Sequence, residues 1–424
     1  MKVFLDSIGC RLNQSEIEKF GSQLSLAGYT VVETLAEADM VVVNTCAVTG
    51  KAASDSRAAI RRASQTGDKK IIVTGCWSTL EPVTASNMPG VQKVIPNRIK
   101  DNLAEELTGF ATDNLDNHLS DGKILRKHQR TRAFIKVQDG CDNHCTFCIT
   151  RIARGESRSR GLNEILNDIK LAFDAGTKEV VLTGVNLGSW GRDHELKHNF
   201  RDLIETILIH TQIPRLRLSS LEPWDLDRGF FDLWTDKRLC RHLHLPLQSG
   251  SARVLKLMAR KITPEQFFEL ASMARKISPE IAITTDIMVG FPGEGENEFL
   301  ESMDFVRSIN FADGHVFNFS ARPGTPAATM QYQVAPDVRK ERSIQIRELV
   351  AIGAKDYREK SIGTTQSVLW EYSNEVNSSA DIIEGLSDNY LHIKARSHEP
   401  RWNIIDSVKI ESISGSSLTG QIIY

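Results

Sequence analysis

The apolar positions of the first hundred residues form short strand-like runs separated by amphipathic helical segments. The strand-like runs cover residues 3–5, 40–43 and 71–73, and the helical segments between them cover residues 15–27 and 52–66. This alternation is typical of βαβ units and predicts a parallel-sheet α/β domain over residues 1–112. In such a sheet the C-terminal ends of the strands share one edge, where ligands bind.

The same alternation returns after a polar stretch at residues 113–132, which we interpret as a linker. Five helical segments follow the strand-like runs, at residues 162–175, 200–210, 251–258, 264–276 and 296–308. The runs themselves lie at residues 133–138, 179–183, 215–219, 242–245, 282–287 and 315–319. Six strands separated by helical segments predict a partial (β/α)6 barrel over residues 133–358, whose working face is the C-terminal end of its strands.

The last part of the chain changes character. Five short alternating runs, separated by Gly, Asn and Ser turns, lie at residues 366–372, 381–386, 391–395, 407–412 and 418–424. They predict a small antiparallel β-barrel over residues 359–424, of the kind that binds oligonucleotides. The predicted fold class is therefore α/β, with a parallel-sheet domain, a partial barrel and a terminal β-barrel.

Composition favours a soluble, cytoplasmic protein without a membrane partner. The apolar runs of this 424-residue chain are far shorter than the ~18 residues that a membrane span needs. Asp6 comes too early for a signal peptide. The net charge is −2, so affinity for nucleic acid has to come from local patches.

Seven cysteines cannot all pair as disulfides, which makes metal ligation or thiol chemistry the first interpretation. Cys10, Cys46 and Cys76 each follow one of the three N-terminal strands, so they converge at one sheet edge. A single cysteine of this kind is usually a small core residue. Three at equivalent positions favour a shared metal centre. Three thiolates suit an iron–sulfur cluster with one open iron better than a four-ligand zinc site.

A second set, Cys141, Cys145 and Cys148, forms a C-x3-C-x2-C loop after the first strand of the predicted barrel. Three thiolates around one loop again leave one iron of a [4Fe–4S] cluster free. A zinc knuckle is the alternative, but it needs a fourth ligand. His144 is the nearby candidate and is too tightly spaced, so we interpret it as a shaping residue. We interpret Cys240 as structural.

Polar residues and glycines gather at the predicted strand ends of the barrel. Alone, each would be an ordinary turn residue, but clusters at successive strand ends predict a ligand site, and glycine lets a cofactor approach the backbone. The candidate cofactor-binding residues are Gly184, Ser219, Glu222, Gln248, Ser249 and Asp286.

Positive charge is concentrated around the second cysteine set. Residues 123–160 contain ten Lys and Arg against three Asp and Glu, whereas residues 361–424 contain four against eight. A solvated face is the usual explanation for such a run, but its position favours a phosphate-binding surface. The candidate RNA-binding residues are Arg130, Arg132, Arg154, Arg158 and Arg160.

The order of these motifs resembles the radical S-adenosylmethionine (SAM) methylthiotransferases. The motifs are Gly9-Cys10-Arg11-Leu12-Asn13, Asn44-Thr45-Cys46-Ala47-Val48-Thr49, Gly75-Cys76 and Gln138-Asp139-Gly140-Cys141 through Cys148. The first two motifs and Leu182–Gly188 look most like the branch that acts on threonylcarbamoyladenosine in tRNA. The resemblance covers nearly the whole chain and implies a TRAM-type terminal barrel.

The resemblance also implies two [4Fe–4S] clusters and two uses of SAM. One SAM methylates a sulfur held at the Cys10/Cys46/Cys76 cluster, and another is reductively cleaved at the second cluster so that hydrogen is taken from C2 of adenosine-37. Because an unactivated C–H bond is out of reach of acid–base catalysis, the cofactor has to carry the chemistry. The implied partners are a tRNA anticodon stem-loop and an electron donor such as flavodoxin or ferredoxin.

Other functions remain open at this point. The related branches act on isopentenyladenosine-37 of tRNA or on an aspartate of a ribosomal protein. A hypothesis of another class is a non-catalytic, metal-containing RNA-binding protein. A two-cluster electron carrier is a further alternative, although the long barrel would then have no purpose.

Overall fold

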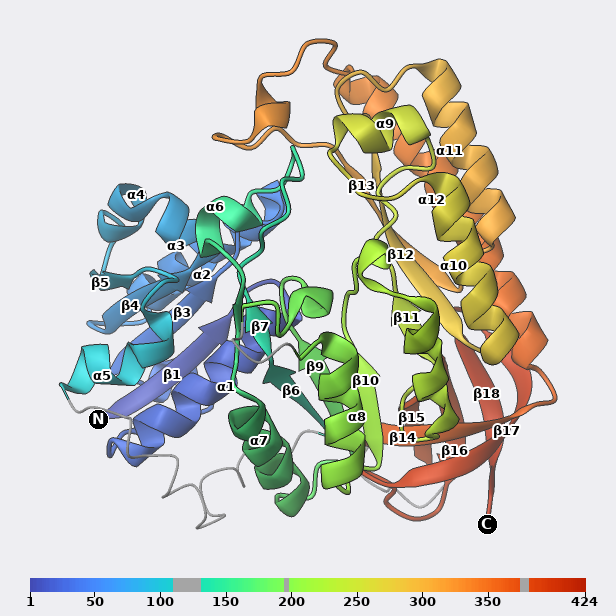
Figure 1. Cartoon of the computed structure of the whole chain (residues 1–424). Helices are drawn as coiled ribbons and strands as arrows, with labels where there is room; N and C mark the ends of the chain where they lie inside the picture. Colours follow the sequence, from blue (N-terminus) through green and yellow to red (C-terminus); the bar gives the residue numbers. More distant parts are fainter. Residues whose placement is uncertain (110–130, 194–197, 374–380) are drawn as a thin grey trace.

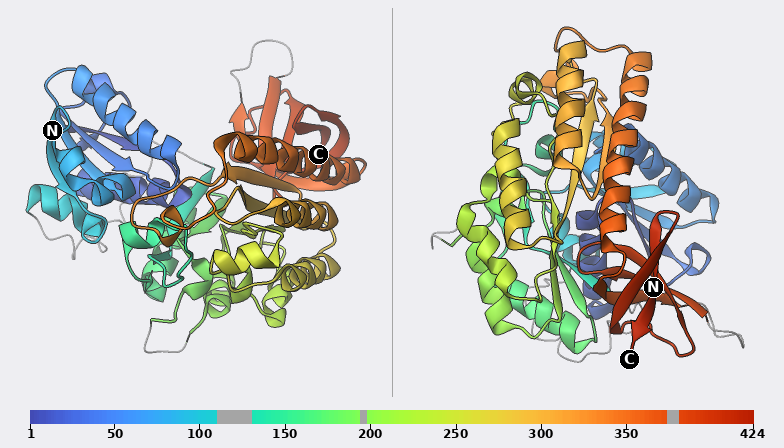
Figure 2. Two further views of the ribbon diagram at one scale, coloured as in Figure 1. Left: turned by 90° about the horizontal axis from the view of Figure 1, so that it is seen from above. Right: turned by 90° about the vertical axis from the view of Figure 1, so that its right-hand side faces the viewer.

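The computed structural model describes residues 1–109, 131–193, 198–373 and 381–424 of the chain. Figure 1 shows three regions in chain order: a blue N-terminal sheet with its helices, a green-to-orange partial barrel, and a red terminal β-barrel. In the left view of Figure 2 the first and last regions flank the partial barrel. The predicted mixed α/β class is confirmed.

The N-terminal sheet is wholly parallel, with strand order β2-β1-β3-β4-β5. Its central strand is buried along its full length because both faces are covered, which explains its continuous apolar run. Helices α1 and α5 pack on one face, and α2 and α4 pack on the other. The strands are β1 Lys2–Ser7, β2 Thr30–Val31, β3 Met40–Thr45, β4 Lys70–Gly75 and β5 Val91–Ile95. The helices are α1 Arg11–Leu26, α2 Gly50–Gln65, α3 Cys76–Leu80, α4 Pro82–Ser86 and α5 Leu103–Thr108.

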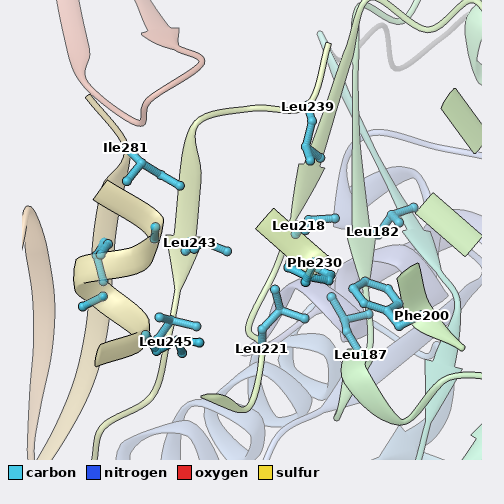
Figure 3. Close-up of a cluster of buried hydrophobic side chains, with 14 of the residues drawn as sticks. Leu182, Leu187, Phe200, Leu218, Leu221, Phe230, Leu239, Leu243, Leu245 and Ile281 are labelled. Atoms are coloured by element: carbon cyan, nitrogen blue, oxygen red, sulfur yellow. The ribbon is translucent and has the colours of Figure 1, made fainter. Parts of the chain in front are cut away.

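The partial barrel has the six parallel strands that the sequence predicts. They form two three-stranded sheets, β10-β9-β6 and β11-β12-β13, and two isolated parallel bridges join β10 to the β11 side. Figure 3 shows the buried leucines and phenylalanines, Leu182 and Phe200 among them, that pack between the strands and the surrounding helices. The strands are β6 Arg132–Lys136, β9 Glu179–Thr183, β10 Arg215–Leu218, β11 His242–His244, β12 Ala282–Val289 and β13 Asp313–Asn318. The outer helices are α7 Leu162–Asp174, α8 Phe200–His210, α9 Ala252–Leu257, α10 Pro264–Ile277 and α11 Glu296–Ile309.

Shorter elements complete the first two regions. The cysteine loop of the barrel lies between the small ribbon β7 Gln138–Asp139 with β8 Arg158–Ser159 and the one-turn helix α6 Thr150–Arg154. The described 3₁₀ segments are η1 Leu35–Glu37, η2 Lys100–Asn102, η6 Leu187–Ser189, η7 Pro223–Asp225, η8 Arg228–Thr235 and η9 Pro326–Ala328.

A 26-residue helix, α12 (Pro336–Ser361), was not among the predicted elements. It packs against β13 and α11 and leads into the terminal barrel (Figure 1). Pro336 occupies its first turn, where the missing N–H costs nothing. Across the described residues, none of the helices combines the length and the apolar character needed to cross a membrane.

The terminal β-barrel is closed, with strand order β14-β15-β16-β18-β17. Its strand pairs are antiparallel except β16 with β18, which run parallel, so the predicted all-antiparallel arrangement needs this correction. Val368, Trp370 and Ile393 belong to its core. The strands are β14 Thr365–Ser373, β15 Asp381–Ser387, β16 His392–Ser397, β17 Ile405–Ser414 and β18 Ser417–Ile423.

The turn between β15 and β16 docks the terminal barrel onto the other two regions. Arg217 of β10 donates to the carbonyl oxygens of Ser387 (3.0 Å) and Asp388 (3.1 Å). Tyr390 stacks on His242 of β11, with ring centroids 4.1 Å apart, and its hydroxyl accepts a 2.7 Å hydrogen bond from Arg11. Residues from all three regions therefore meet at Tyr390.

Candidate active site

Cys141, Cys145 and Cys148 line a cavity of about 230 Å³ at the C-terminal strand ends of the partial barrel. Gly140 shapes the start of their loop: its φ is +70°, and a Cβ there would lie 1.8 Å from the carbonyl oxygen of Glu156. A residue with a side chain is excluded at this point. The loop is tied down at Thr146, whose backbone N–H donates to the carbonyl oxygen of Met258 (3.1 Å).

The opposite wall of this cavity carries charged side chains. Arg260 donates to Glu222 (3.0 Å) and to the carbonyl oxygen of Pro246 (2.6 Å), and its Nη1 lies 3.8 Å from the sulfur of Cys145. Its guanidinium also lies 4.3 Å from the ring centroid of Trp224. Sequence reasoning missed Arg260, since nothing in its local sequence separates it from a surface arginine.

Three of the six predicted cofactor-binding residues line the cavity: Glu222, Gln248 and Asp286. The other three, Gly184, Ser219 and Ser249, are not among its lining residues. Their chain neighbours Val185 and Ser220 are among them, whereas Ser249 is buried and hydrogen-bonds Ser302 (3.1 Å). The strand ends named in the prediction therefore lie at this cavity, and which of the six side chains bind a cofactor stays a prediction.

Gln248 and Asp286 are held in place by unusual local geometry. Gln248 has a φ of +70°, a conformation that residues other than glycine rarely adopt and that often marks a functional site. The backbone N–H of Gln248 donates to the carbonyl oxygen of Asp286 (2.8 Å). The Asp286 carboxylate lies 3.3 Å from Nε2 of His244. These contacts fix two polar side chains on the cavity wall.

The donor set of this cavity fits an iron–sulfur cluster and SAM. Soft thiolates select iron–sulfur clusters, and Asn143 offers a buried side-chain nitrogen without a protein partner beside them. Burial raises the pKa of Cys141 to about 11, so metal binding has to displace its proton. Among the described residues, no three His, Cys, Asp or Glu side chains lie close enough together to bind a single metal ion. A cluster instead places each thiolate on its own iron atom.

The structure brings the three N-terminal cysteine loops together at the sheet edge. Cys10 caps α1, Cys46 follows β3, and Cys76 begins α3 directly after β4. Gly9 packs so closely on Cys46 that a Cβ would lie 2.5 Å from its sulfur, and a Cβ on Gly75 would lie 2.3 Å from the Thr45 carbonyl oxygen. Burial, followed by the neighbouring thiols of Cys10 and Cys76, raises the pKa of Cys46 to about 11.

Two asparagines hold these loops in place, and the sequence analysis assigned a role to neither. Asn13 donates to the carbonyl oxygens of Ile8 (2.8 Å) and Thr45 (3.0 Å), which joins the loops of Cys10 and Cys46. Nδ2 of Asn97 lies 3.6 Å from the sulfur of Cys76. Asn13 belongs to the Gly9–Asn13 motif, so its position beside Cys10 in that motif could have indicated a role at the site. Asn97 lies in none of the sequence motifs, so nothing in the sequence indicated its contact with Cys76.

The four predicted RNA-binding arginines among the described residues differ in exposure and pairing. Arg158 is exposed, whereas Arg132 pairs with Glu371 (2.6 Å). Arg160, 17% exposed, pairs with Asp168 (2.8 Å). Arg130 lies outside the described residues. Arg154 is only 4% exposed and faces the interior, so the expectation that it contacts RNA is corrected.

Comparison with known proteins agrees with this arrangement. Residues 135–306 match the family described as the radical SAM superfamily, and residues 2–95 match one described as uncharacterized protein family UPF0004. The chain is 34% identical to the Bacillus subtilis protein named threonylcarbamoyladenosine tRNA methylthiotransferase MtaB, over 96% of this chain and 93% of that one. Its identity to the MtaB of Thermotoga maritima is also 34%, over 97% and 95% of the two chains.

Two further comparisons are more distant. The tRNA-2-methylthio-N(6)-dimethylallyladenosine synthase of Acetivibrio thermocellus is 30% identical over 99% of this chain and 90% of its own. Among solved structures, the radical SAM methyltransferase TsrM of Kitasatospora setae superposes with a TM-score of 0.57 at 16% identity, covering 77% of each chain. This last likeness concerns the fold alone.

The cysteine loop, the six parallel strands and the matching superfamily define a radical SAM enzyme, a class that uses SAM and a [4Fe–4S] cluster. With relatives of 34% identity along nearly its whole length, the chain belongs to the radical SAM methylthiotransferase family.

Proposed function

We propose that this chain inserts a methylthio group at C2 of N6-threonylcarbamoyladenosine-37 in tRNA and uses two [4Fe–4S] clusters to do so. The proposed substrate rests on the 34% identity, over nearly the full length, to two enzymes named for threonylcarbamoyladenosine tRNA. The enzyme named for dimethylallyladenosine is 30% identical. The presence of two separate cysteine triads supports the use of two clusters.

Cys141, Cys145 and Cys148 would hold the radical cluster, and the cavity beside them would hold SAM. When bound, this pair supplies the electron transfer and the radical that removes hydrogen from C2 of the adenine. The carboxylates of Glu222 and Asp286 can accept hydrogen bonds from the amino group and hydroxyls of SAM. The Arg260 guanidinium, 2.7 Å from the Glu222 carboxylate, would hold that side chain in position.

Cys10, Cys46 and Cys76 would hold the second cluster, where the transferred sulfur is kept. Cys46 and Cys76 are buried and Cys10 is exposed, so a group at this site would be enclosed on the protein side and open toward a substrate. Asn13 and Asn97 would hold the loops of this site in place.

The RNA would approach across the exposed part of the basic stretch. Arg158 is exposed and can meet a phosphate, and Arg132 and Arg160 can add to it from their ion pairs. The target base has to leave the anticodon stem-loop to reach the cavity, as bases do in other base-modifying enzymes. We place this function in the cytoplasm, with a flavodoxin or ferredoxin as electron donor.

The test is mass spectrometry of tRNA nucleosides from a deletion strain carrying wild-type or variant chains. We expect the deletion to remove the methylthio group from threonylcarbamoyladenosine. Loss from isopentenyladenosine, or from a ribosomal aspartate, would refute the proposed substrate but leave the chemistry intact.

Purified variants separate the two triads. Cys145→Ala should abolish formation of 5′-deoxyadenosine, whereas Cys46→Ala should keep that cleavage and stop methylthiolation. Cys240→Ala is the matched control, because Cys240 is also buried but belongs to neither triad. Equal loss of both activities in Cys46→Ala, with an intact radical cluster, would contradict the division of roles. Unreacted SAM in the wild type under strong reductant would favour a non-catalytic protein.

A further inference from the structure

The one-turn helix α6 connects the two cysteine triads. It starts two residues after Cys148, and it packs against α3, the helix that begins with Cys76 (Figure 1). The carbonyl oxygen of Ala153 in α6 accepts a 2.8 Å hydrogen bond from Asn97, and the same nitrogen of Asn97 lies 3.6 Å from the sulfur of Cys76. One short segment therefore touches the surroundings of both triads.

Arg154, the last residue of α6, is the centre of this connection. Its guanidinium donates to Glu16 (2.9 Å), to Asp139 (2.8 Å) and to the side-chain oxygen of Asn13 (2.7 Å). Glu16 and Asn13 belong to α1, which starts directly after Cys10, and Asp139 lies two residues before Cys141. The same guanidinium thus ties the element that follows Cys10 to the strand that precedes Cys141.

The buried charges around Arg154 do not balance. Arg154, Lys100 and Lys136 are three buried cations, and Glu16 and Asp139 are two buried carboxylates. Asp101 also pairs with Lys136, but its side chain is 47% exposed. With Asp101 the network holds three cations and three carboxylates, but its buried part alone has one cation more than it has carboxylates, so a further anion beside that part would be stabilising.

The N-terminal triad can supply that anion. A [4Fe–4S]2+ core held by three cysteine thiolates carries a net charge of −1. Burial alone would lower the pKa of Arg154, but Glu16 and the thiols of Cys76 and Cys10 are among the groups that raise it, which places the triad within electrostatic reach. The charge of the buried part of the network and the charge of a loaded triad are therefore complementary.

We propose that Arg154 is a positioning residue that holds the N-terminal cluster in register with the radical cluster and compensates its negative charge. This inference rests on the proposed two-cluster function. Sulfur transfer requires the sulfur at one site and the substrate radical at the other to meet. A small displacement of one site would therefore leave SAM cleavage intact but reduce the formation of methylthiolated product.

The experiment compares Arg154→Gln, Arg154→Lys and a matched control in the full chain loaded with both clusters. Arg342→Gln is the control, because Arg342 is also buried and paired with a buried carboxylate, Glu294 (2.8 Å). The first readout is the amount of 5′-deoxyadenosine formed per methylthiolated product on an anticodon stem-loop RNA. We expect this ratio to rise at least about tenfold in Arg154→Gln and to stay unchanged in Arg342→Gln. A merely structural defect lowers both products together.

The second readout is the reduction potential of the N-terminal cluster, followed by electron paramagnetic resonance in a background lacking Cys141, Cys145 and Cys148. Arg154→Gln should make the potential more negative, because a buried positive charge is lost beside an anionic cluster. Arg154→Lys keeps the charge but not the fork of three hydrogen bonds. It should retain the potential and still raise the product ratio.

The outcomes separate the two proposals. A wild-type chain that holds a single cluster, or that methylthiolates no RNA, refutes the proposed function and this inference with it. An active wild type together with an Arg154→Gln variant of unchanged ratio and unchanged potential refutes this inference alone. If Arg154→Gln does not load both clusters, an unchanged ratio in Arg154→Lys overturns the positioning role.

Discussion

Replacing Glu179 by glutamine should destabilise the contact between the partial barrel and the terminal barrel. Glu179 begins β9 and is fully buried, and it accepts two hydrogen bonds from Arg217, at 2.6 and 3.1 Å. A second guanidinium, that of Arg215, lies 3.6 Å away. The glutamine amide has nearly the same shape but no charge, so both buried cations would lose their anion.

The size of the effect follows from this burial. Removing one partner of a buried ion pair costs about 3–5 kcal/mol, because the remaining charge is left uncompensated in a poorly solvated site. Glu205→Gln is the matched control: its 2.8 Å pair with Arg201 lies on the exposed side of α8. Exposed pairs of this spacing contribute only about 0.3–0.5 kcal/mol.

Urea unfolding followed by circular dichroism measures both free-energy changes. A limited-proteolysis time course adds a local readout, because Arg217 also holds the carbonyl oxygens of Ser387 and Asp388 in the terminal barrel. We expect faster cleavage within the terminal barrel of Glu179→Gln. The reasoning is refuted if Glu179→Gln costs no more than Glu205→Gln and the proteolysis of the two variants is the same.

Three further predictions concern the site. Burial would raise the pKa of Glu16, but Arg154 and two buried lysines lower it to about 2, below the usual 4.5 of a free glutamate. Its ionisation therefore stabilises the fold above pH 4.5, by about 3 kcal/mol, and this contribution is lost as the pH falls from 4.5 toward 2. Urea midpoints measured as a function of pH should show the wild type more stable than Glu16→Gln above pH 4.5 and losing this extra stability between pH 4.5 and 2. If the midpoints of the two proteins change with pH in parallel, the prediction is wrong. Gly75→Ala should lower the iron content of the chain, because φ is +98° and a Cβ would meet the Thr45 carbonyl oxygen at 2.3 Å. Full iron loading would show that the loop can adapt. Arg158→Ala should weaken tRNA binding and reduce the slope of log affinity against log salt by about 0.9. If a chain ending near residue 360 loses far more affinity while Arg158→Ala loses none, the terminal barrel is the main RNA contact.

The periodicity of the sequence predicted the regular elements of the first two regions well. The predicted runs at 179–183 and 200–210 match β9 and α8, because both are buried on a well-defined face and sharply bounded. Helix α12 was missed for a physical reason. Its buried stripe is narrow and includes Arg342 beside Ile346 and Val350, so the hydrophobic period that marks a helix is weak.

The chemistry of the site was only partly predictable. The positions of the cysteines indicated the two triads, because metal ligation by thiolates requires cysteine itself and is therefore visible in the sequence. Arg154 and Glu16, in contrast, are 138 positions apart, and Arg260 and Cys145 are 115 apart. A run of positive charge shows how many cations a segment carries, but not which of them turn inward. Only the packing of α6 against the N-terminal region distinguishes Arg154 from Arg158.

The meeting of three regions at Tyr390 also has a consequence for how the protein is made. Arg11 and Tyr390 are 379 positions apart, and the contact between them can form only after the ribosome has synthesised nearly the whole chain. The residues of the three N-terminal cysteine loops are synthesised hundreds of positions earlier. The growing polypeptide therefore passes through a long stage in which all three N-terminal cysteine loops are present but the contact between Arg11 and Tyr390 is not.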